Sequence, residues 1–394
     1  MLAKRVKKIK ESATMAVAAK AKELKSTGVD VIGLNVGEPD YDTPLNIKAA
    51  GIDAIHEGHT KYTAVSGTAS LKREIIRKFE RENSLTYAED EVMASCGAKQ
   101  AIINLMLATL NPGDEVIIPS PYWTSYPEMC RLAEAKPVIA KTKQADCFKL
   151  SSEKLESSIS KKTKMLILNS PSNPTGMVYT SEELSSLAEV LRKYPEIIIL
   201  SDDIYEHIIW PGSTFCNILN VAPDLKDRTV LINGVSKTYA MTGWRIGYAA
   251  GNNEIIKAMT KLQSQTTSSP CSISQAAAAE ALATEKNTVK EMVQAYHSRY
   301  NFISSVLAEI PEIELTPSNG TFYIFPKVTK LIKKLGLKND VELAEFLLEK
   351  AHISVVPGSA FGSPQNIRIS FAISKKRLKE GFERMKAAIL AHEE

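Results

Sequence analysis

The feature that most constrains the fold is a regular alternation of short apolar runs with helical segments between about residues 95 and 250. Apolar residues recur at helical spacing in 97–110 and 181–194, and Thr180 with Glu183 forms a capping-box pattern before the second segment. Short runs rich in β-branched residues separate the helical segments, at 114–121, 164–171, 196–203 and 228–237. This alternation predicts an α/β fold with a mostly parallel sheet and helices on both faces.

Each apolar run ends in a cluster of polar, glycine or proline residues. The clusters read PSPYW, NSPSNPTG, SDDIYE and NGVSK. In open α/β sheets, ligands bind outside the carboxyl ends of the strands. The sequence therefore predicts that the four clusters face one crevice.

The pattern changes after about residue 285. Residues 288–310 read as one long helix, and strand-like stretches follow before a last helix from Lys375. We expect residues 1–44 to form an N-terminal arm and part of a small domain. Residues 45–287 would form a large α/β domain that binds a cofactor, and residues 288–394 a small C-terminal α+β domain.

Composition argues against several classes of protein. The 394 residues carry 49 basic and 45 acidic side chains, interspersed along the chain, which gives no basis for nucleic-acid or membrane binding. Five cysteines without a C-x-x-C pair indicate a reducing compartment, and we expect a cytoplasmic protein. The basic start, MLAKRVKKIK, suits a transit peptide or an arm on the mature protein, and Glu11 and Glu23 favour the arm.

Several common catalytic motifs are missing from the sequence. It contains neither standard glycine-rich nucleotide loop and no G-x-S-x-G elbow. We expect His56 and His59 to be surface residues and Cys96 to be buried and structural, and we predict no metal site. The strand ends retain a lysine with an aspartate, an asparagine and aromatic residues. A lysine nucleophile suggests Schiff-base chemistry, and pyridoxal phosphate needs such a lysine and an acidic partner.

The order and spacing of these motifs resemble the class I aminotransferases, pyridoxal-phosphate enzymes of fold type I, and most of all their bacterial aspartate aminotransferase branch. The resemblance covers nearly the whole chain, from Ser12 to Arg368. It rests on GEPDYDTP, TKY, GAKQ, PGDEV, SPYW, NSPSNPTG, SDDIYE, SKTYAMTGWRIGY, GTFY and VVPGSAFG. It implies a mostly parallel large-domain sheet, a smaller α+β domain and a pyridoxal 5′-phosphate cofactor.

The resemblance also implies a catalytic group of residues. Lys237 matches the lysine that bonds to the cofactor's aldehyde carbon and later moves the proton of the substrate. Asp202 matches the aspartate that keeps the pyridine nitrogen protonated. Tyr205 and Asn173 match groups that hydrogen-bond the cofactor's phenolic oxygen, whereas Asp203 is expected to be a solvated neighbour.

A second group would hold the cofactor's phosphate. Arg245 matches the phosphate-binding arginine, and Ser236 would add a hydroxyl. Ala98 and Lys99 lie in a turn that opens a helix, whose N–H groups favour phosphate. Tyr62 matches a tyrosine that reaches the phosphate in the neighbouring subunit, which implies a homodimer with shared active sites.

A third group would bind the substrate. Arg368 matches the arginine that clamps the α-carboxylate, and Gly37 would offer its N–H to the same group. Trp123, which matches the ring stacked on the pyridine or else packs in the core, would line this space together with Asn173. In related bacterial enzymes the lysine at the position of Lys99 is linked to acidic substrates.

The sequence departs from the family pattern at two places. Gly234 replaces a phosphate-binding serine of many relatives, so this contact is lost or moves to Ser236. Residues 264–271 contain no arginine for a distal carboxylate, and Ser12 and Thr14 are placed to assist Lys99 instead.

The resemblance implies an aminotransferase that moves the amino group of L-aspartate or L-glutamate to a 2-oxo acid such as 2-oxoglutarate by ping-pong half-reactions. An aromatic or prephenate aminotransferase is the alternative, and a pyridoxal-phosphate-dependent β-lyase is a further one. A regulatory protein that has kept the fold would need a fused DNA-binding segment or a lost lysine, and Lys237 is present.

Overall fold

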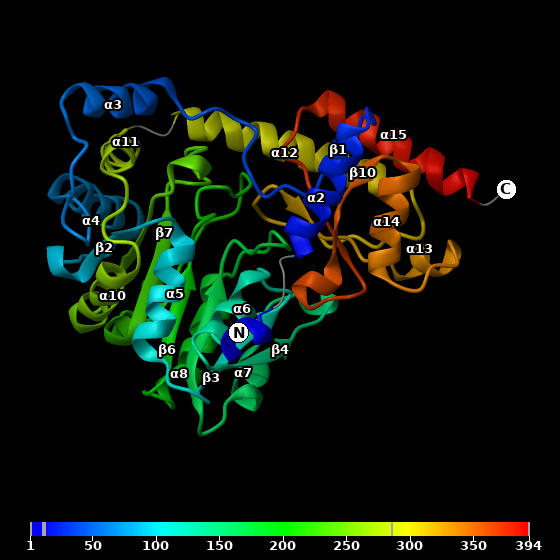
Figure 1. Cartoon of the computed structure of the whole chain (residues 1–394). Coiled ribbons are helices and arrows are strands. Elements are labelled where there is room, and N and C mark those ends of the chain that lie inside the picture. Colours follow the sequence, from blue (N-terminus) through cyan, green and yellow to red (C-terminus); the bar gives the residue numbers. More distant parts are fainter. Residues whose placement is uncertain (1, 10–12, 285–286, 393–394) are drawn as a thin grey trace.

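The structure, a computed structural model that describes residues 2–9, 13–284 and 287–392, is built around a seven-stranded sheet (Figure 1). The strands in spatial order are β2 (Val92–Ser95), β8 (Gly247–Ala250), β7 (Thr229–Gly234), β6 (Ile198–Asp202), β5 (Thr163–Asn169), β3 (Glu115–Ser120) and β4 (Lys136–Lys141). Strands β7, β6, β5, β3 and β4 run parallel, and β8 is antiparallel to both of its neighbours. The predicted mostly parallel sheet is confirmed.

Helices bury both faces of this sheet, and successive strand residues point to opposite sides, so each strand contributes to two cores. Met165 and Ile167 belong to a core with helices α5 (Ala98–Thr109), α6 (Ser125–Leu132) and α10 (Asn253–Thr266). Leu166 and Leu168 belong to a core with α4 (Ala69–Asn83), α8 (Ser181–Arg192) and α11 (Ser272–Ala283). The predicted capping box is present at the start of α8, where Thr180 and Glu183 each accept the other's backbone N–H.

The last quarter of the chain forms a second group of elements. Helix α12 (Asn287–Ala308), the long helix predicted over 288–310, leads to α13 (Thr329–Lys334), α14 (Asp340–Lys350) and α15 (Lys375–Ala391) (Figure 1). The antiparallel strands β11 (Val356–Pro357), β12 (Ile367–Ser370) and β9 (Tyr323–Ile324) lie among them. The N-terminal β1 (Ile32–Gly33) pairs in parallel with β10 (Ile353–Ser354), and α2 (Ala13–Ser26) packs against β10 and β11.

The remaining helices are α1 (Lys4–Lys8), α3 (Leu45–His56), α7 (Ser152–Ser158) and α9 (Ile218–Val221). Within the described ranges, the helices are too short or too polar to cross a bilayer.

Candidate active site

A cavity of about 440 Å³ opens beyond the carboxyl ends of β5, β6 and β7. Eleven of the residues that the sequence assigned to the cofactor or substrate line it, namely Gly37, Ala98, Lys99, Trp123, Asn173, Asp202, Tyr205, Ser236, Lys237, Arg245 and Arg368. The prediction that the strand-end clusters face one crevice is therefore confirmed. Arg368 comes from β12 and Gly37 from the loop after β1, so the two groups of elements enclose the cavity together.

Lys237 lies in the turn that follows β7. Its Nζ donates a hydrogen bond to the carbonyl oxygen of Gly37 at 2.6 Å. Burial lowers the pKa of the Lys237 amine to about 8, although the negative charge of Glu38 opposes the shift. A neutral amine, which is the nucleophilic form, is therefore accessible near neutral pH.

Asp202 ends β6 and is only 4% exposed. The hydroxyl of Tyr126 donates to its Oδ2 at 2.6 Å, and the N–H of Ile204 donates to its Oδ1 at 3.3 Å. Burial raises the pKa of the carboxyl to about 6. A cationic group bound beside Asp202 would favour its ionised form.

Tyr126 was missed by sequence reasoning, although it follows the PSPYW cluster by three residues. Tyr126 lies in the first turn of α6 and packs edge to face against Trp123, with the two ring centres 5.3 Å apart. Its partner Asp202 lies 76 positions away in the sequence, so no local signal marks this tyrosine.

Two expectations about single residues were wrong. Asp203 is not solvated but 2% exposed, and its carboxylate accepts the Ser201 hydroxyl at 2.7 Å. The turn after β6 directs it into the protein, where burial and the charge of Glu206 raise its pKa to about 8. Cys96 is exposed rather than buried, because it sits outside β2 at the turn before α5.

Arg368 is a buried cation whose hydrogen bonds among the described residues go to an amide and a carbonyl and not to a carboxylate. Its Nη1 donates to Asn173 Oδ1 at 3.1 Å, and its Nη2 donates to the Asn35 carbonyl at 2.7 Å. Its Nε has no hydrogen-bond partner within the described part of the chain. A buried guanidinium in this state is stabilised by an anion from outside the chain, and a carboxylate fits its planar fork.

A tyrosine pair borders Arg368. The hydroxyls of Tyr205 and Tyr323 lie 2.9 Å apart, and the Arg368 guanidinium lies 4.5 Å from the centre of the Tyr323 ring. Burial raises the pKa of both phenols, so both remain proton donors at neutral pH. The sequence marked GTFY only as a motif and assigned Tyr323 no role. A Cβ at Gly37 would lie 2.7 Å from the Tyr323 hydroxyl, so a larger residue there would displace this ring.

The opposite end of the cavity is built for an anion. Gly97 has a φ of +80° and caps α5, and a Cβ at this position would collide with the Arg245 guanidinium. Arg245 Nη1 is held by the Thr242 carbonyl at 2.9 Å, and Ser236 lies buried nearby in the cavity wall. An arginine, a hydroxyl and the N–H groups of a helix start make a suitable phosphate site.

The departure at Gly234 has a steric reason. A Cβ at this position would lie 2.9 Å from the carbonyl oxygen of Ile246, because β8 passes close to β7. A serine at 234 would therefore require the two strands to separate.

Lys99 and Trp123 form the outer wall. The Lys99 Nζ lies 5.0 Å from the centre of the Trp123 ring. Burial and the neighbouring Arg245 lower the pKa of Lys99. Met15 of α2 also lines the cavity. Ser12 and the side chain of Thr14 lie outside the part of the chain that the structure describes.

Tyr62 lies apart from this cavity, with 94% of its surface exposed. It follows a helix, α3, whose large apolar residues Leu45, Ile52 and Ile55 are also exposed.

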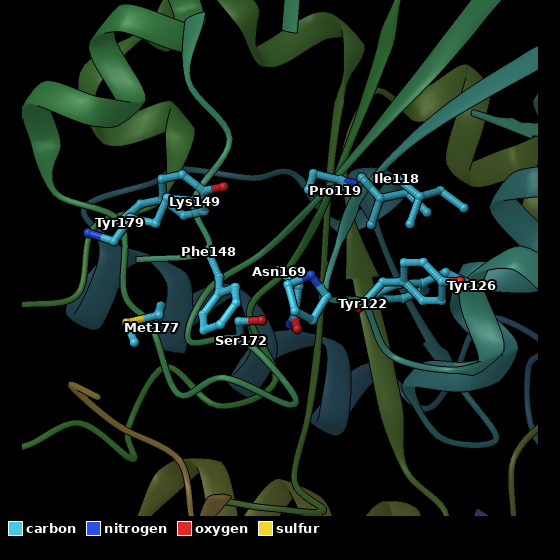
Figure 2. A pocket seen from close by; sticks show the side chains of 12 residues that line it. Ile118, Pro119, Tyr122, Tyr126, Phe148, Lys149, Asn169, Ser172, Met177 and Tyr179 are labelled. Carbon is cyan, nitrogen blue, oxygen red and sulfur yellow. The ribbon is translucent and has the colours of Figure 1, made fainter. Parts of the chain in front are cut away.

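A second cavity of about 30 Å³ (Figure 2) shares the lining residues Tyr126 and Asn169 with the first. This volume holds a water molecule or two but no amino acid. Asn169 separates the two cavities and donates to the Asp202 carbonyl at 2.9 Å, while its Oδ1 accepts the N–H of Asn173 at 2.9 Å. The larger cavity is therefore the candidate active site.

Comparison with known proteins agrees with this geometry. The family model for aminotransferase class I and II matches residues 29–385. The chain is 51% identical over 390 residues to an aspartate/prephenate aminotransferase of Nitrosomonas europaea, covering 98% of each chain. It is 46% identical over 391 residues to an aspartate aminotransferase of Bacillus subtilis, covering 99% of each.

Solved structures give the same result. An aspartate aminotransferase from Rhizobium meliloti superimposes with a TM-score of 0.95 at 45% identity, covering 99% of this chain and 98% of that one. The aspartate aminotransferase of Thermus thermophilus with maleate superimposes with a TM-score of 0.93 at 40% identity, covering 98% and 99%. The chain therefore belongs to the class I and II aminotransferase family.

Proposed function

We propose that this aminotransferase uses pyridoxal 5′-phosphate to move the amino group of L-aspartate or L-glutamate to a 2-oxo acid such as 2-oxoglutarate, in two ping-pong half-reactions. The observation that carries the proposal is the buried Arg368, whose Nε has no partner among the residues that the structure describes and which faces the same cavity as Lys237 and Asp202. The relatives named above as aspartate aminotransferases support the choice of donor.

The residues of the cavity fit the cofactor. Gly97 leaves open the space that the Arg245 guanidinium fills, so a phosphate would bind between Arg245, Ser236 and the start of α5. Asp202 would hold a proton on the pyridine nitrogen, and Trp123 would cover the ring. When bound, pyridoxal phosphate withdraws the electrons of the substrate's α-carbon.

The chain's own groups would then perform the remaining tasks. Arg368 would clamp the α-carboxylate of the amino acid, with the Gly37 N–H beside it. The neutral Lys237 amine would take the proton from the substrate's α-carbon and deliver it to the cofactor's aldehyde carbon. Tyr205 and Asn173 would donate hydrogen bonds that hold the cofactor in register with Lys237.

Replacing Lys99 by alanine should lower kcat/KM for aspartate and glutamate about 10-fold, because a lysine–carboxylate hydrogen bond contributes about 1.5 kcal/mol. Tyrosine and alanine as donors should lose much less, since neither has a second carboxylate. The measurement is a panel of amino donors in single half-reactions, followed by loss of the visible absorption of the lysine-bound cofactor. Lys99→Arg keeps the charge and serves as the control. Equal losses for all donors would remove Lys99 from substrate selection.

The same panel, run with oxo acids, tests the second candidate, a prephenate or aromatic aminotransferase. The adjacent cation and aromatic ring of Lys99 and Trp123 favour it, because prephenate combines carboxylates with an unsaturated ring. The relative from Nitrosomonas europaea carries the name aspartate/prephenate aminotransferase. Release of a β-substituent instead of an exchanged amino group would indicate the β-lyase.

We further propose a homodimer in which Tyr62 reaches the partner subunit's phosphate site. The exposed apolar face of Leu45, Ile52 and Ile55 beside Tyr62 supports this interface. Tyr62→Phe should then weaken cofactor binding roughly 10-fold, the effect of one hydrogen bond to a charged group. A hybrid dimer would combine one Tyr62→Phe subunit with one Lys237→Ala subunit. Because each site would take its tyrosine from the partner subunit, one site would carry both changes and the other neither. Cofactor titration of such hybrids should show half the sites with wild-type affinity, whereas a Tyr62 that acts within its own chain would show none.

The proposed domain division, 1–44, 45–287 and 288–394, is supported by the pairing of β1 with β10 and by the start of α12.

A cytoplasmic location is supported by the five free cysteines, which are Cys96, Cys130, Cys147, Cys216 and Cys271.

A further inference from the structure

We propose that a buried polar network behind the cavity, built from Lys78, Glu82, Glu206, His207 and Thr238, positions Lys237 relative to Asp202 and Tyr205. The proposal rests on the proposed function, since positioning matters only if these three residues act together. None of the five network residues lines the cavity, so they are positioning residues and not catalytic ones.

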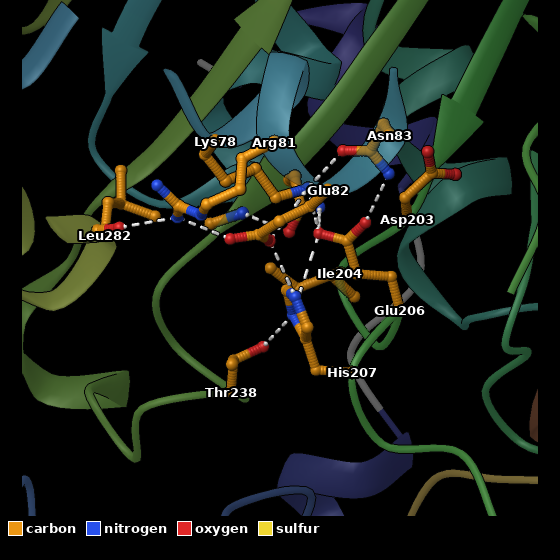
Figure 3. Close-up of polar contacts among 12 residues, drawn as sticks. Lys78, Arg81, Glu82, Asn83, Asp203, Ile204, Glu206, His207, Thr238 and Leu282 are labelled. Carbon is orange, nitrogen blue, oxygen red and sulfur yellow. Dashed lines mark hydrogen bonds and ion pairs between the residues drawn. The ribbon is translucent and has the colours of Figure 1, made fainter. Parts of the chain in front are cut away.

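His207 forms the central link of the network (Figure 3). Its Nε2 lies 2.8 Å from Glu82 Oε2, and its Nδ1 lies 3.1 Å from the Thr238 hydroxyl oxygen. Because the Glu82 carboxylate can only accept, Nε2 carries the proton. In the neutral ring Nδ1 then accepts the Thr238 hydroxyl proton, so the imidazole joins α4 to the turn after β7.

Glu206 ties the network to the sheet. Its Oε1 accepts from Asn233 of β7 at 2.7 Å, and its Oε2 accepts from Asn83 of α4 at 2.9 Å. It also forms an ion pair with Lys78, whose Nζ donates to Asn83 Oδ1 at 2.7 Å. Lys78 and Glu206 are both almost fully buried, so loss of either would leave an uncompensated charge.

Chain connectivity makes this network relevant to the active site. Thr238 directly follows Lys237, and Glu206 and His207 directly follow Tyr205 in the turn that begins at Asp202. The hydrogen bond between His207 and Thr238 is therefore a direct cross-link between the two turns that carry the proposed catalytic groups. Catalytic rates are sensitive to displacements of about 1 Å, so a bond that sets this spacing should affect the reaction.

Glu82, Glu206 and His207 also bring three ligand-type atoms close together, as a metal site would. However, Lys78 already supplies a positive charge to Glu206, and Arg81 supplies one to Glu82. The cluster is therefore complete as a network of side chains, and a positioning role explains it without an added ion.

The test compares two buried threonines, Thr229 at the start of β7 and Thr238 in the turn that follows it. Thr238→Val removes the hydroxyl that meets His207, and Thr238→Ser restores it. Thr229→Val is the matched control, since Thr229 is also buried but its hydroxyl donates to the Leu225 carbonyl at 2.8 Å, away from the cavity. His207→Phe removes the same link from the other side and keeps the network testable if Thr238→Val folds poorly.

We expect Thr238→Val and His207→Phe each to lower kcat about 5- to 10-fold, the effect of one net hydrogen bond, with little change in KM for the amino donor. Both should change the pH midpoint of the visible absorption of the lysine-bound cofactor. The double variant should lose no more than His207→Phe alone, because the bond that Thr238→Val removes is already absent there. Thr238→Ser and Thr229→Val should keep the wild-type midpoint and kcat.

A crystal structure of the Thr238→Val protein supplies a readout that needs no cofactor. The proposal expects the hydrogen bond from Lys237 to the Gly37 carbonyl to lengthen or break. The proposal would be overturned if the Thr238→Val protein kept the wild-type kcat, the wild-type pH midpoint of the visible absorption and the wild-type position of Lys237, even if its stability fell. Absence of any visible absorption in the wild-type protein would instead refute the proposed function, while the crystal structure would still decide the positioning role.

Discussion

Replacing Lys237 by alanine is expected to lower the rate of transamination by about 10⁴-fold, the upper range for loss of a proton-transferring group. The amine would serve first as the nucleophile and, once the amino acid has displaced it, as the proton carrier, and its pKa of about 8 suits both tasks. Cofactor should still bind through Arg245 and Asp202, but the visible absorption of the lysine-bound form should be lost. Single-turnover kinetics and absorption spectra with L-aspartate measure both effects.

The control for this variant is Lys149→Ala. Lys149 is also a largely buried lysine, paired with Glu183 at 2.8 Å, but it lies outside the active-site cavity. It should keep its spectrum and most of its activity even if it loses stability. Transamination by Lys237→Ala at the wild-type rate would refute the assignment of Lys237.

Replacing Asp202 by asparagine should lower kcat by about 10²- to 10³-fold, as loss of a preorganised electrostatic contact typically does. The amide keeps the shape and can still meet Tyr126, but it carries no charge to hold a proton on the cofactor's ring nitrogen. Steady-state kinetics together with cofactor titration separate this loss of rate from loss of binding.

Asp203→Asn is the matched control, since Asp203 is the adjacent and equally buried carboxyl. Its pKa of about 8 leaves it largely protonated at neutral pH, and an amide is a close mimic of that form. Its oxygen can still accept the Ser201 hydroxyl, so kcat should stay near wild type. Equal losses for the two variants would assign the effect to packing rather than to the charge of Asp202.

Much of the fold could be predicted because the signals for it are local. The alternation of apolar runs with helical segments located β3, β5, β6 and β7, and the cap at Thr180 located the start of α8. The antiparallel direction of β8 could not be read in this way, because it depends on how the turn through Arg245 returns the chain to the sheet.

The residues of the candidate site show the same difference between local and long-range signals. Lys237, Asp202 and Asn173 were found because they stand at strand ends in recognisable motifs. Tyr126 and Tyr323 were missed because their importance lies in contacts with Asp202 and Tyr205, which are distant in sequence. The error at Asp203 has the same origin, since the burial of this side chain depends on contacts that the family pattern does not show.

The sequence by itself determined the α/β class, the strand-end location of the site and the chemical groups within it, because hydrophobic periodicity and motif spacing act over a few neighbouring residues. The tertiary structure alone decided which charges are desolvated. The burial of Arg368 beside Asn173, the contact of Asp202 with Tyr126, and the His207 link to Thr238 exist only because strands and helices from distant parts of the chain meet there. Burial then sets the pKa values of Lys237 and Asp202, and no linear pattern encodes burial of this kind.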